Sequence, residues 1–349
     1  MRVLKTDPIR PDPSVLAEAA RVLRSGGLVA FPTETVYGLG ARAYDPAAVR
    51  RVFGVKGRPS DNPLIVHVDS VEMAEEVFLE IPEWARAFLE RVWPGPVTVV
   101  LPKSRRVPDE VTAGLDTVAV RAPAHPVALG MIRELGEPVA APSANLSGRP
   151  SPTTAQHVLE DLGDRVDLII DAGETFLGVE STVIDLTTDP PTLLRPGPVA
   201  VEDLVKLLGR EVRVPPYARG LGAPDVARSP GLKHRHYAPS KPVVLVECGE
   251  LPPHECAMCV ARVVEELRAS GREPVVVASE EVAPAITGRV IVLGSRGSLF
   301  EVAKNLFKAL RIADALPGDV IVAEGFPEEG IGLAVMNRLR RASAERRGC

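Results

Sequence analysis

Cationic side chains in the segment KGRP (56–59) are spaced so that they could hold one anion. Residues two apart project to the same face of an extended chain, so Lys56 and Arg58 can converge on a single ligand. Asn62 and His67 follow, and His67 lies in an expected strand. The segment therefore indicates a phosphate or carboxylate site, with a solvated basic loop as the alternative interpretation.

A second anion-binding pattern runs from residue 140 to residue 153. It supplies small side chains, hydroxyls and turn residues, and then opens an expected helix whose capping box joins Thr153 to Gln156. Backbone N–H groups, hydroxyls and a helix N-terminus together can bind an anion without a metal-binding cage. An ordinary loop rich in serine and proline is the alternative.

Further polar groups lie near the ends of other expected strands. The segment FPTETVYGLG (31–40) leaves a buried strand and presents three side-chain oxygens at its carboxyl end, where α/β folds place ligands. A turn with capping threonines would explain the same residues. Arg121, Arg195 and the segment GVESTV (178–183) add guanidiniums and hydroxyls, and each is equally well explained as a structural partner.

Motifs of several other enzyme classes are absent from the sequence. There is no P-loop, no G-x-S-x-G segment and no H-E-x-x-H motif, and the G-x-G at 38–40 lacks the acidic residue of a dinucleotide site. The candidate groups are cations, hydroxyls and backbone donors without a nucleophile–base pair. They suit nucleotidyl or phosphoryl transfer, in which the substrates supply the reactive atoms and the protein supplies position and charge.

The cysteines offer a weaker signal. Cys256 and Cys259 form a single C-x-x-C with Cys248 and His254 nearby, which would allow a metal site or a disulfide. Because an amphipathic helix begins there and no second C-x-x-C occurs, we interpret these cysteines as packing residues.

Composition limits the classes of protein that the chain can represent. With 349 residues and a net charge of −5, it is not a general nucleic-acid coat or an anionic-membrane binder, although a local basic cleft is compatible. No apolar run approaches the roughly 20 residues that span a bilayer, and the first residues form no signal core, so we expect a cytoplasmic protein. Abundant arginine and proline with a single glutamine favour a thermophilic source.

The elements that must position these groups alternate between strands and helices. We expect short strands at 28–31, 64–68, 97–101, 117–121, 168–171, 181–186 and 192–194. We expect helices near 14–23, 47–53, 71–79, 83–92 and 127–135. This mixture predicts α/β layers around a twisted mixed sheet. After residue 241, four strands alternate with three helices, which predicts a small parallel three-layer unit.

The segment between these two units has the composition of a linker. Residues 213–241 contain five prolines and no sustained periodicity, yet they hold the polar cluster KHRHY (233–237). A linker with such a cluster does more than separate two domains.

Taken together, these segments closely resemble the threonylcarbamoyl-AMP synthase family in its two-domain form. The matching segments, in family order, are FPTETVYGLG (31–40), KGRPSDNPLIVHV (56–68), WPGPVTVVL (93–101), TVAVRAPAHP (117–126), APSANLSGRPSPT (141–153), GVESTVIDL (178–186), LRPG (194–197) and SPGLKHRHYAP (229–239). One conservative departure is Leu232, where the family pattern has methionine. The resemblance implies a twisted mixed-sheet, YrdC-like catalytic domain (1–212), a linker or lid (213–241) and a Rossmann-like C-terminal domain (242–349).

The resemblance also implies the reaction. L-threonine, bicarbonate or CO2, and ATP would give threonylcarbamoyl-AMP, pyrophosphate and water, with Mg2+ held mainly by the nucleotide. A downstream complex would transfer the threonylcarbamoyl group to tRNAs that read ANN codons, while this chain would bind tRNA weakly or not at all and would have no membrane partner.

Residue roles follow from the same resemblance. The reacting centre would be lined by Lys56, Arg58, Ser143 and Asn145. L-threonine would contact Thr35, His67, Arg121, Ala141 and Ser181. ATP would contact Arg58, Asn62, Thr117, Ser143, Ser151, Arg195 and Ser229, and the lid residues would be His236 and Tyr237.

Three other interpretations remain open at this point. The first is a carbamoyltransferase-like or hydrogenase-maturation domain, although the acylphosphatase and zinc-finger segments of such proteins are absent. The second is an RNA-binding module without catalysis, which the net charge of −5 disfavours. The third gives the C-terminal domain a regulatory or partner-docking role, which is compatible with the main interpretation.

Overall fold

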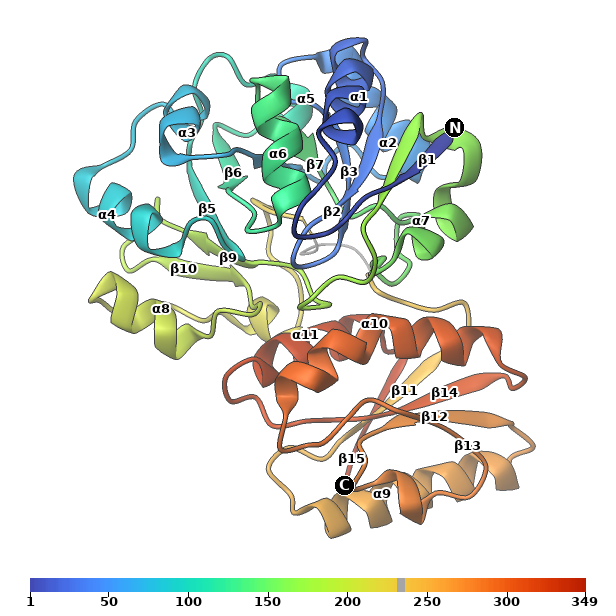
Figure 1. Ribbon diagram of the computed structural model, residues 1–349. Coiled ribbons are helices and arrows are strands. Elements are labelled where there is room, and N and C mark those ends of the chain that lie inside the picture. The colour runs from blue at the N-terminus through green and yellow to red at the C-terminus, as the bar shows by residue number, and fades with distance from the viewer. Residues whose placement is uncertain (231–235) are drawn as a thin grey trace.

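The computed structural model describes residues 1–230 and 236–349, which form two α/β units, each around its own sheet (Figure 1). We call residues 1–212 the first unit and residues 242–349 the second unit. Leu232 and the first three residues of the cluster at 233–237 lie outside the described residues. In the described part of the chain, no helix is long and apolar enough to cross a membrane.

The first unit contains a ten-stranded sheet among the described residues, in the order β1-β8-β2-β3-β7-β4-β6-β5-β9-β10. Strand β2 is antiparallel to β3 and parallel to β8, so the expected mixed sheet is confirmed. The strands are β1 (Arg2–Lys5), β2 (Val29–Pro32), β3 (Tyr37–Arg42), β4 (Ile65–His67), β5 (Val97–Pro102), β6 (Thr117–Arg121), β7 (Val139–Ala141), β8 (Leu168–Asp171), β9 (Thr182–Asp185) and β10 (Thr192–Arg195).

Helices cover both faces of this sheet. Val29 and Phe31 in β2 pack with α1 and α6, whereas Ala30 between them packs on the opposite face in the core that contains residues of α2. This alternation follows from the two-residue period of a strand. The helices of the first unit are α1 (Pro13–Arg24), α2 (Pro46–Lys56), α3 (Val71–Val77), α4 (Glu83–Val92), α5 (Asp109–Thr112), α6 (Pro126–Leu135), α7 (Ala155–Leu162) and α8 (Val201–Leu208).

Two helix starts differ from the sequence expectation. The helix expected near 14–23 begins at Pro13, and its N-cap is Asp12, whose carboxylate accepts from the Ser14 N–H at 2.8 Å. The N-cap of α7 is Thr154 rather than Thr153, and its hydroxyl accepts from the His157 N–H at 3.2 Å. Strands β1, β3 and β7 were not expected, because they are short or glycine-containing and lack a clear apolar alternation.

The second unit contains a parallel sheet of five strands among the described residues, in the order β13-β12-β14-β11-β15. Its strands are β11 (Val243–Glu247), β12 (Pro274–Ala278), β13 (Arg289–Val292), β14 (Val320–Glu324) and β15 (Glu345–Gly348). Helix α9 (Pro253–Ala269) packs on one face, and α10 (Leu299–Ala315) and α11 (Gly332–Ala342) pack on the other. The predicted three-layer unit is confirmed; only the charged edge strand β15 was missed.

Helices α10 and α11 lie on the face of the second unit that points toward the first (Figure 1). The chain between the units ends on this face, where the ring of Tyr237 stacks on Phe307 of α10 with centroids 5.2 Å apart. The second unit is therefore joined to the first by packed helices as well as by the linker.

The interpretation of the cysteines as simple packing residues is wrong. Cys256 is bridged to Cys248 and Cys259 is bridged to Cys349, so the C-x-x-C pair is split between two disulfides. Sequence spacing could not show this, because the second bridge depends on β15 bringing the chain end beside α9. In the described residues, no group of three or more His, Cys, Asp and Glu side chains is placed to hold a metal ion.

Candidate active site

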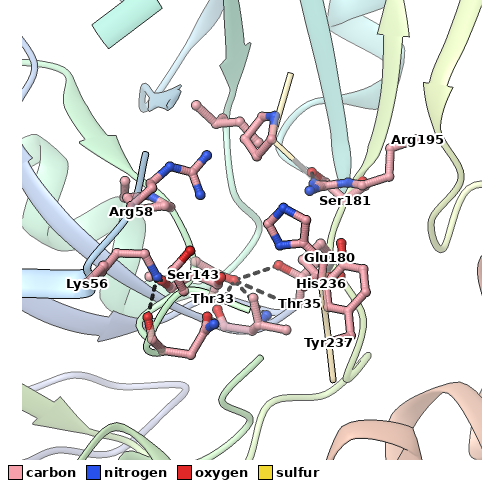
Figure 2. A pocket seen from close by; sticks show the side chains of 18 of the residues that line it. Thr33, Thr35, Lys56, Arg58, Ser143, Glu180, Ser181, Arg195, His236 and Tyr237 are labelled. Atoms are coloured by element: carbon pink, nitrogen blue, oxygen red, sulfur yellow. Dashed lines mark hydrogen bonds between the residues drawn. The ribbon is translucent and has the colours of Figure 1, made fainter. Parts of the chain in front are cut away.

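A cavity in the first unit gathers most of the predicted site residues (Figure 2). Its walls come from the turn after β2, the end of α2, strand β4, the end of β6, the loop after β7 and the segments that flank β9 and β10. The predicted residues that line it are Thr35, Lys56, Arg58, His67, Arg121, Ala141, Ser143, Asn145, Ser181, Arg195, His236 and Tyr237.

Four residues predicted to contact ATP do not line this cavity: Asn62, Thr117, Ser151 and Ser229. All four are buried. The hydroxyl of Ser151 donates to Glu180, which does line the cavity, and the backbone carbonyl of Asn62 accepts from Arg58 at 3.1 Å. The cavity thus contains the residues predicted to bind L-threonine and those of the predicted reacting centre. Part of the predicted ATP site consists of buried residues that do not line the cavity.

Lys56 is the last residue of α2, and Gly57 ends the helix in the left-handed conformation with φ of 60°. The Lys56 ammonium donates to the carbonyl of Ser143 at 2.5 Å and to that of Asn145. Beyond the turn, Arg58 Nη2 donates to the carbonyl of Pro63 at 2.9 Å. Among the described residues, neither side chain forms an ion pair with a carboxylate, so neither is neutralised before a ligand binds.

Burial makes this group of cations electrostatically unfavourable without a ligand. The pKa of Lys56 lies well below its ordinary value, first because the amine is buried and then because Arg58 is close. Burial also lowers the pKa of Arg195, and Arg338 and Arg121 add to that effect. An anion in the cavity would relieve this repulsion, so the electrostatics favour a negatively charged ligand.

Arg121 organises the other end of the cavity. Its Nη1 donates to the Thr35 hydroxyl at 2.9 Å, and its guanidinium pairs with the buried carboxylate of Glu34 at 2.5 Å. Register in the sheet places His67 opposite Arg121, since β4 and β6 run parallel. Burial, assisted by Arg121, lowers the pKa of His67 to about 3, so this imidazole is neutral near pH 7.

Ser181 and Arg195 meet where β9 begins and β10 ends. Arg195 donates to the Ser181 carbonyl at 3.1 Å and to its hydroxyl at 3.2 Å, and that hydroxyl lies 2.7 Å from the hydroxyl of Thr98. The antiparallel pairing of β9 and β10 brings the two residues together. A serine oriented by an arginine and a threonine offers directed hydrogen bonds to a polar ligand.

Among the residues at the site that received no predicted role are Thr33, Glu34 and Glu180. The Thr33 hydroxyl lies 2.8 Å from that of Thr35 and donates to the Val36 carbonyl at 2.6 Å, so it holds the turn after β2. Burial alone would raise the pKa of Glu180. Arg338 and Arg195 outweigh this effect, so the pKa lies below its ordinary value. All three lie inside segments with recognisable motifs, but partners distant in sequence determine their roles.

His236 and Tyr237 line the cavity from the linker. Tyr237 adopts a left-handed conformation with φ of 63°, and the next residue, Ala238, donates its N–H to the Gly148 carbonyl at 2.8 Å. The end of the linker is therefore attached to the loop after β7 and covers one side of the cavity.

Comparison with known proteins agrees with this architecture. A family model described as "Telomere recombination" matches residues 21–197, and one described as "Threonylcarbamoyl-AMP synthase, C-terminal domain" matches residues 199–344. The chain is 52% identical over 328 residues, or 94% of each chain, to the threonylcarbamoyl-AMP synthase of Pyrococcus abyssi. It belongs to the threonylcarbamoyl-AMP synthase family.

A second relative and a solved structure extend the similarity to the whole length. The chain is 44% identical to the threonylcarbamoyl-AMP synthase of Bacillus subtilis over 98% of its own length and 96% of that protein. A crystal structure of P. abyssi Sua5 complexed with L-threonine matches it with a TM-score of 0.93 and 48% identity, covering 100% of both chains. The similarity therefore includes both units and their connection.

Proposed function

We propose that the chain is an L-threonylcarbamoyladenylate synthase, a nucleotidyltransferase that uses ATP as a substrate. The amine of L-threonine adds to CO2 and loses a proton to give a carbamate, and a carbamate oxygen then attacks the α-phosphorus of ATP. The bond from that phosphorus to the bridging oxygen breaks, and pyrophosphate leaves. When bicarbonate is the carbon source, one water is also released.

The observation that carries this proposal is the set of buried cations around one cavity. Lys56, Arg58, Arg121 and Arg195 line it, whereas Glu180 is the one carboxylate among the described lining residues and is paired with Arg338. The reaction brings together a carboxylate, a carbamate and a triphosphate, all of them negative. Fixed cations in a site shielded from water stabilise the charge that develops at the phosphorus and need not reorganise to do so.

The two ends of the cavity suit the two substrates. We assign the carboxylate, amine and hydroxyl of L-threonine to the end with Thr35, His67, Arg121, Ala141 and Ser181. Lys56, Arg58, Ser143 and Asn145 would surround the reacting atoms. ATP would extend toward Asn62, Thr117, Ser151, Arg195 and Ser229, where the buried side-chain oxygens of Asn62 and Ser229 have no hydrogen-bond partner in the described structure.

The residues present do not form a protein-held Mg2+ site. Carboxylate oxygens are the usual protein ligands of this ion, and among the residues that the structure describes the cavity offers one carboxylate, which is paired with an arginine. We propose that Mg2+ enters on the triphosphate as part of the nucleotide, where it neutralises phosphate charge.

The lid and the partners complete the proposal. His236 and Tyr237 would close over the site and limit hydrolysis of the adenylate. The product would pass to a tRNA-modifying complex that transfers the threonylcarbamoyl group, with weak or no binding of tRNA by this chain. ATP, bicarbonate and tRNA are all available in the cytoplasm, where we place the reaction.

The test is pyrophosphate release from ATP and bicarbonate with each proteinogenic amino acid added separately. We expect release that L-threonine alone stimulates and that Lys56→Ala abolishes. Lys206→Ala is the matched control, because Lys206 is an exposed lysine of α8 outside the cavity. Release that is indifferent to threonine would contradict the proposal and redirect attention to carbamoyltransferase chemistry.

A further inference from the structure

Two buried arginines of the second unit reach into the first unit. Arg311 of α10 is 8% exposed and Arg338 of α11 is 0% exposed. Each forms an ion pair with a buried carboxylate of the first unit, Arg311 with Asp161 and Arg338 with Glu180. Neither arginine lines the cavity, so neither would touch a ligand bound there directly.

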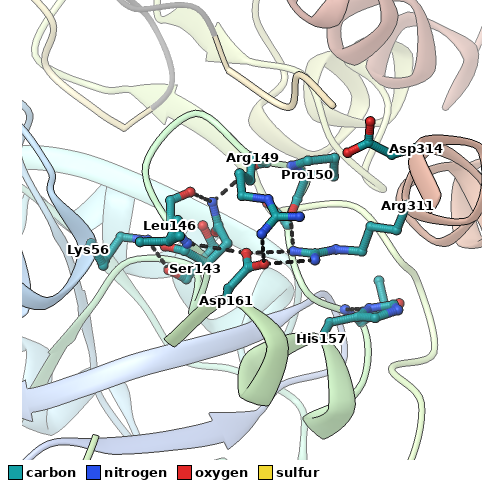
Figure 3. A network of polar contacts seen from close by, with 12 residues as sticks. Lys56, Ser143, Leu146, Arg149, Pro150, His157, Asp161, Arg311 and Asp314 are labelled. Atoms are coloured by element: carbon teal, nitrogen blue, oxygen red, sulfur yellow. Dashed lines mark hydrogen bonds and ion pairs between the residues drawn. The ribbon is translucent and has the colours of Figure 1, made fainter. Parts of the chain in front are cut away.

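Arg311 binds Asp161 through both ends of its guanidinium (Figure 3). The Nη1–Oδ1 distance is 3.0 Å and the Nη2–Oδ2 distance is 2.8 Å. Nη2 also donates to the carbonyl of Pro150 at 2.5 Å. Such a two-point pair fixes orientation as well as distance, so the carboxylate of Asp161 has one favoured position.

Asp161 in turn holds the loop that follows β7. Its Oδ2 accepts from the Leu146 N–H at 3.2 Å, and its Oδ1 lies 2.8 Å from Nη1 of Arg149. The neighbouring Asn145 supplies one of the two carbonyls that accept from Lys56. A continuous set of polar contacts therefore runs from α10 to the predicted reacting centre (Figure 3).

Arg338 makes a second connection between the units. Its Nε donates to Glu180 Oε2 at 3.1 Å, and its Nη1 donates to the carbonyl of Pro196 at 2.5 Å. Glu180 accepts from the hydroxyl of Ser151, and Pro196 follows Arg195 in the chain. The same loop is thus held near residue 146 by Arg311 and at residue 151 through Arg338.

These contacts matter because the loop from 142 to 151 forms no helix or strand and must position its groups by other means. Buried ion pairs contribute little net stability, since desolvation opposes their attraction, but they allow few alternative arrangements. A reacting centre needs its groups placed closely, and misplacement by about 1 Å can reduce a rate about a hundredfold.

We propose that Arg311 and Arg338 are positioning residues of the adenylation site, so that the second unit sets the conformation of the nucleotide-binding loop. The inference rests on the proposed function. Arg311 acts only on the side of Lys56 and ATP, because its contacts are with Asp161 and Pro150. Arg338 also contacts the segment that carries Ser181, so its loss would weaken the binding of both L-threonine and ATP.

The test compares Arg311→Met with Lys308→Met. Lys308 lies on the same helix and also pairs across the boundary between the units, with Glu174 at 3.3 Å, but this contact is more exposed and does not reach the loop. We expect Arg311→Met to weaken binding of a non-hydrolysable ATP analogue about tenfold or more, while the Kd for L-threonine changes less than about twofold. Arg311→Lys should recover part of the affinity, and Lys308→Met should change neither constant.

A second pair of variants separates positioning from stability. Asp161→Asn should weaken nucleotide binding as Arg311→Met does, and the double variant should show little further loss, because both substitutions break one connection. Unchanged nucleotide affinity in folded Arg311→Met protein, with only a lower melting temperature, would overturn the inference. Threonine-dependent pyrophosphate release by the unaltered chain tests the proposed function separately, since the affinity measurements do not require turnover.

Discussion

Binding of ATP should be accompanied by proton uptake, and Lys56 is the group that we expect to take up the proton. In the free protein, burial and then Arg58 lower the pKa of Lys56 well below its ordinary value. The carbonyls of Ser143 and Asn145 accept two of the amine hydrogens. Protonation adds one more N–H, which would point to the phosphates, and the negative charge of the nucleotide raises the pKa again.

The sign and size of this effect follow from linkage. A lysine whose pKa is depressed in the free protein and restored in the complex gains a proton on binding, so affinity falls as pH rises. Where the free lysine is neutral and the bound lysine is charged, the association constant falls about tenfold per pH unit. The triphosphate is already ionised near pH 8, because the second pKa of a phosphate monoester is about 6.

Calorimetry measures the proton directly. The binding enthalpy of a non-hydrolysable ATP analogue is recorded in buffers that differ in ionisation enthalpy. The slope of binding enthalpy against buffer ionisation enthalpy gives the number of protons exchanged on binding. We expect proton uptake for the unaltered protein and for Lys206→Met, and clearly less uptake for Lys56→Met. A slope of zero in the unaltered protein would mean that Lys56 is charged before ATP arrives, and would refute the reasoning.

Three other perturbations have defined outcomes. Arg121→Met leaves the buried carboxylate of Glu34 without its ion-pair partner, so urea denaturation should show a loss of about 3–5 kcal/mol in unfolding free energy, and a loss below about 1 kcal/mol would contradict this. Cys349→Ser removes a disulfide with a sequence separation of 90, and loop entropy predicts a loss of about 4.6 kcal/mol in unfolding free energy. Cys248→Ser removes a disulfide with a separation of 8, for which the predicted loss is about 2.5 kcal/mol. The melting temperature measured without reductant should therefore fall further for Cys349→Ser than for Cys248→Ser. Equal decreases would count against the loop-entropy account. Tyr237→Ala should raise ATP hydrolysis relative to adenylate formation, measured as phosphate or pyrophosphate released per product, whereas an unchanged ratio would argue against a lid.

Local sequence patterns predicted the helices and strands around the site. The prediction was most reliable where a short apolar run is bounded by charged or proline residues. The strand Thr117–Arg121 and the helix Glu83–Val92 have the predicted limits, because charged or proline residues mark where burial begins and ends. Lys56 and Arg58 line one cavity as predicted, but the expected extended chain is wrong, because Lys56 ends α2 and Gly57 turns the chain in the left-handed conformation. Such features depend on neighbours in the chain, which the sequence displays directly.

Features that depend on long-range pairing were not predictable in this way. Strand β15 has the charged sequence of a solvent-exposed tail and becomes a strand only beside β11. The partners of Cys256 and Cys259 depend on that same pairing. Arg311 and Arg338 lie in amphipathic helices, where an arginine ordinarily marks the solvent side, and only the packing of the two units buries them.

The pairing of those arginines also explains how the cavity keeps its positive charge. Glu180 lines the cavity and interacts favourably with Arg195, and Asp161 favours the charged form of Lys56. Without a stronger partner, the Glu180 carboxylate would turn toward Arg195 and occupy the place of an anionic substrate. Arg338 holds Glu180 at the edge of the cavity, and Arg311 holds Asp161 behind the loop. The second unit thereby keeps these two carboxylates from neutralising the cations that would bind the phosphates and carboxylate of the substrates.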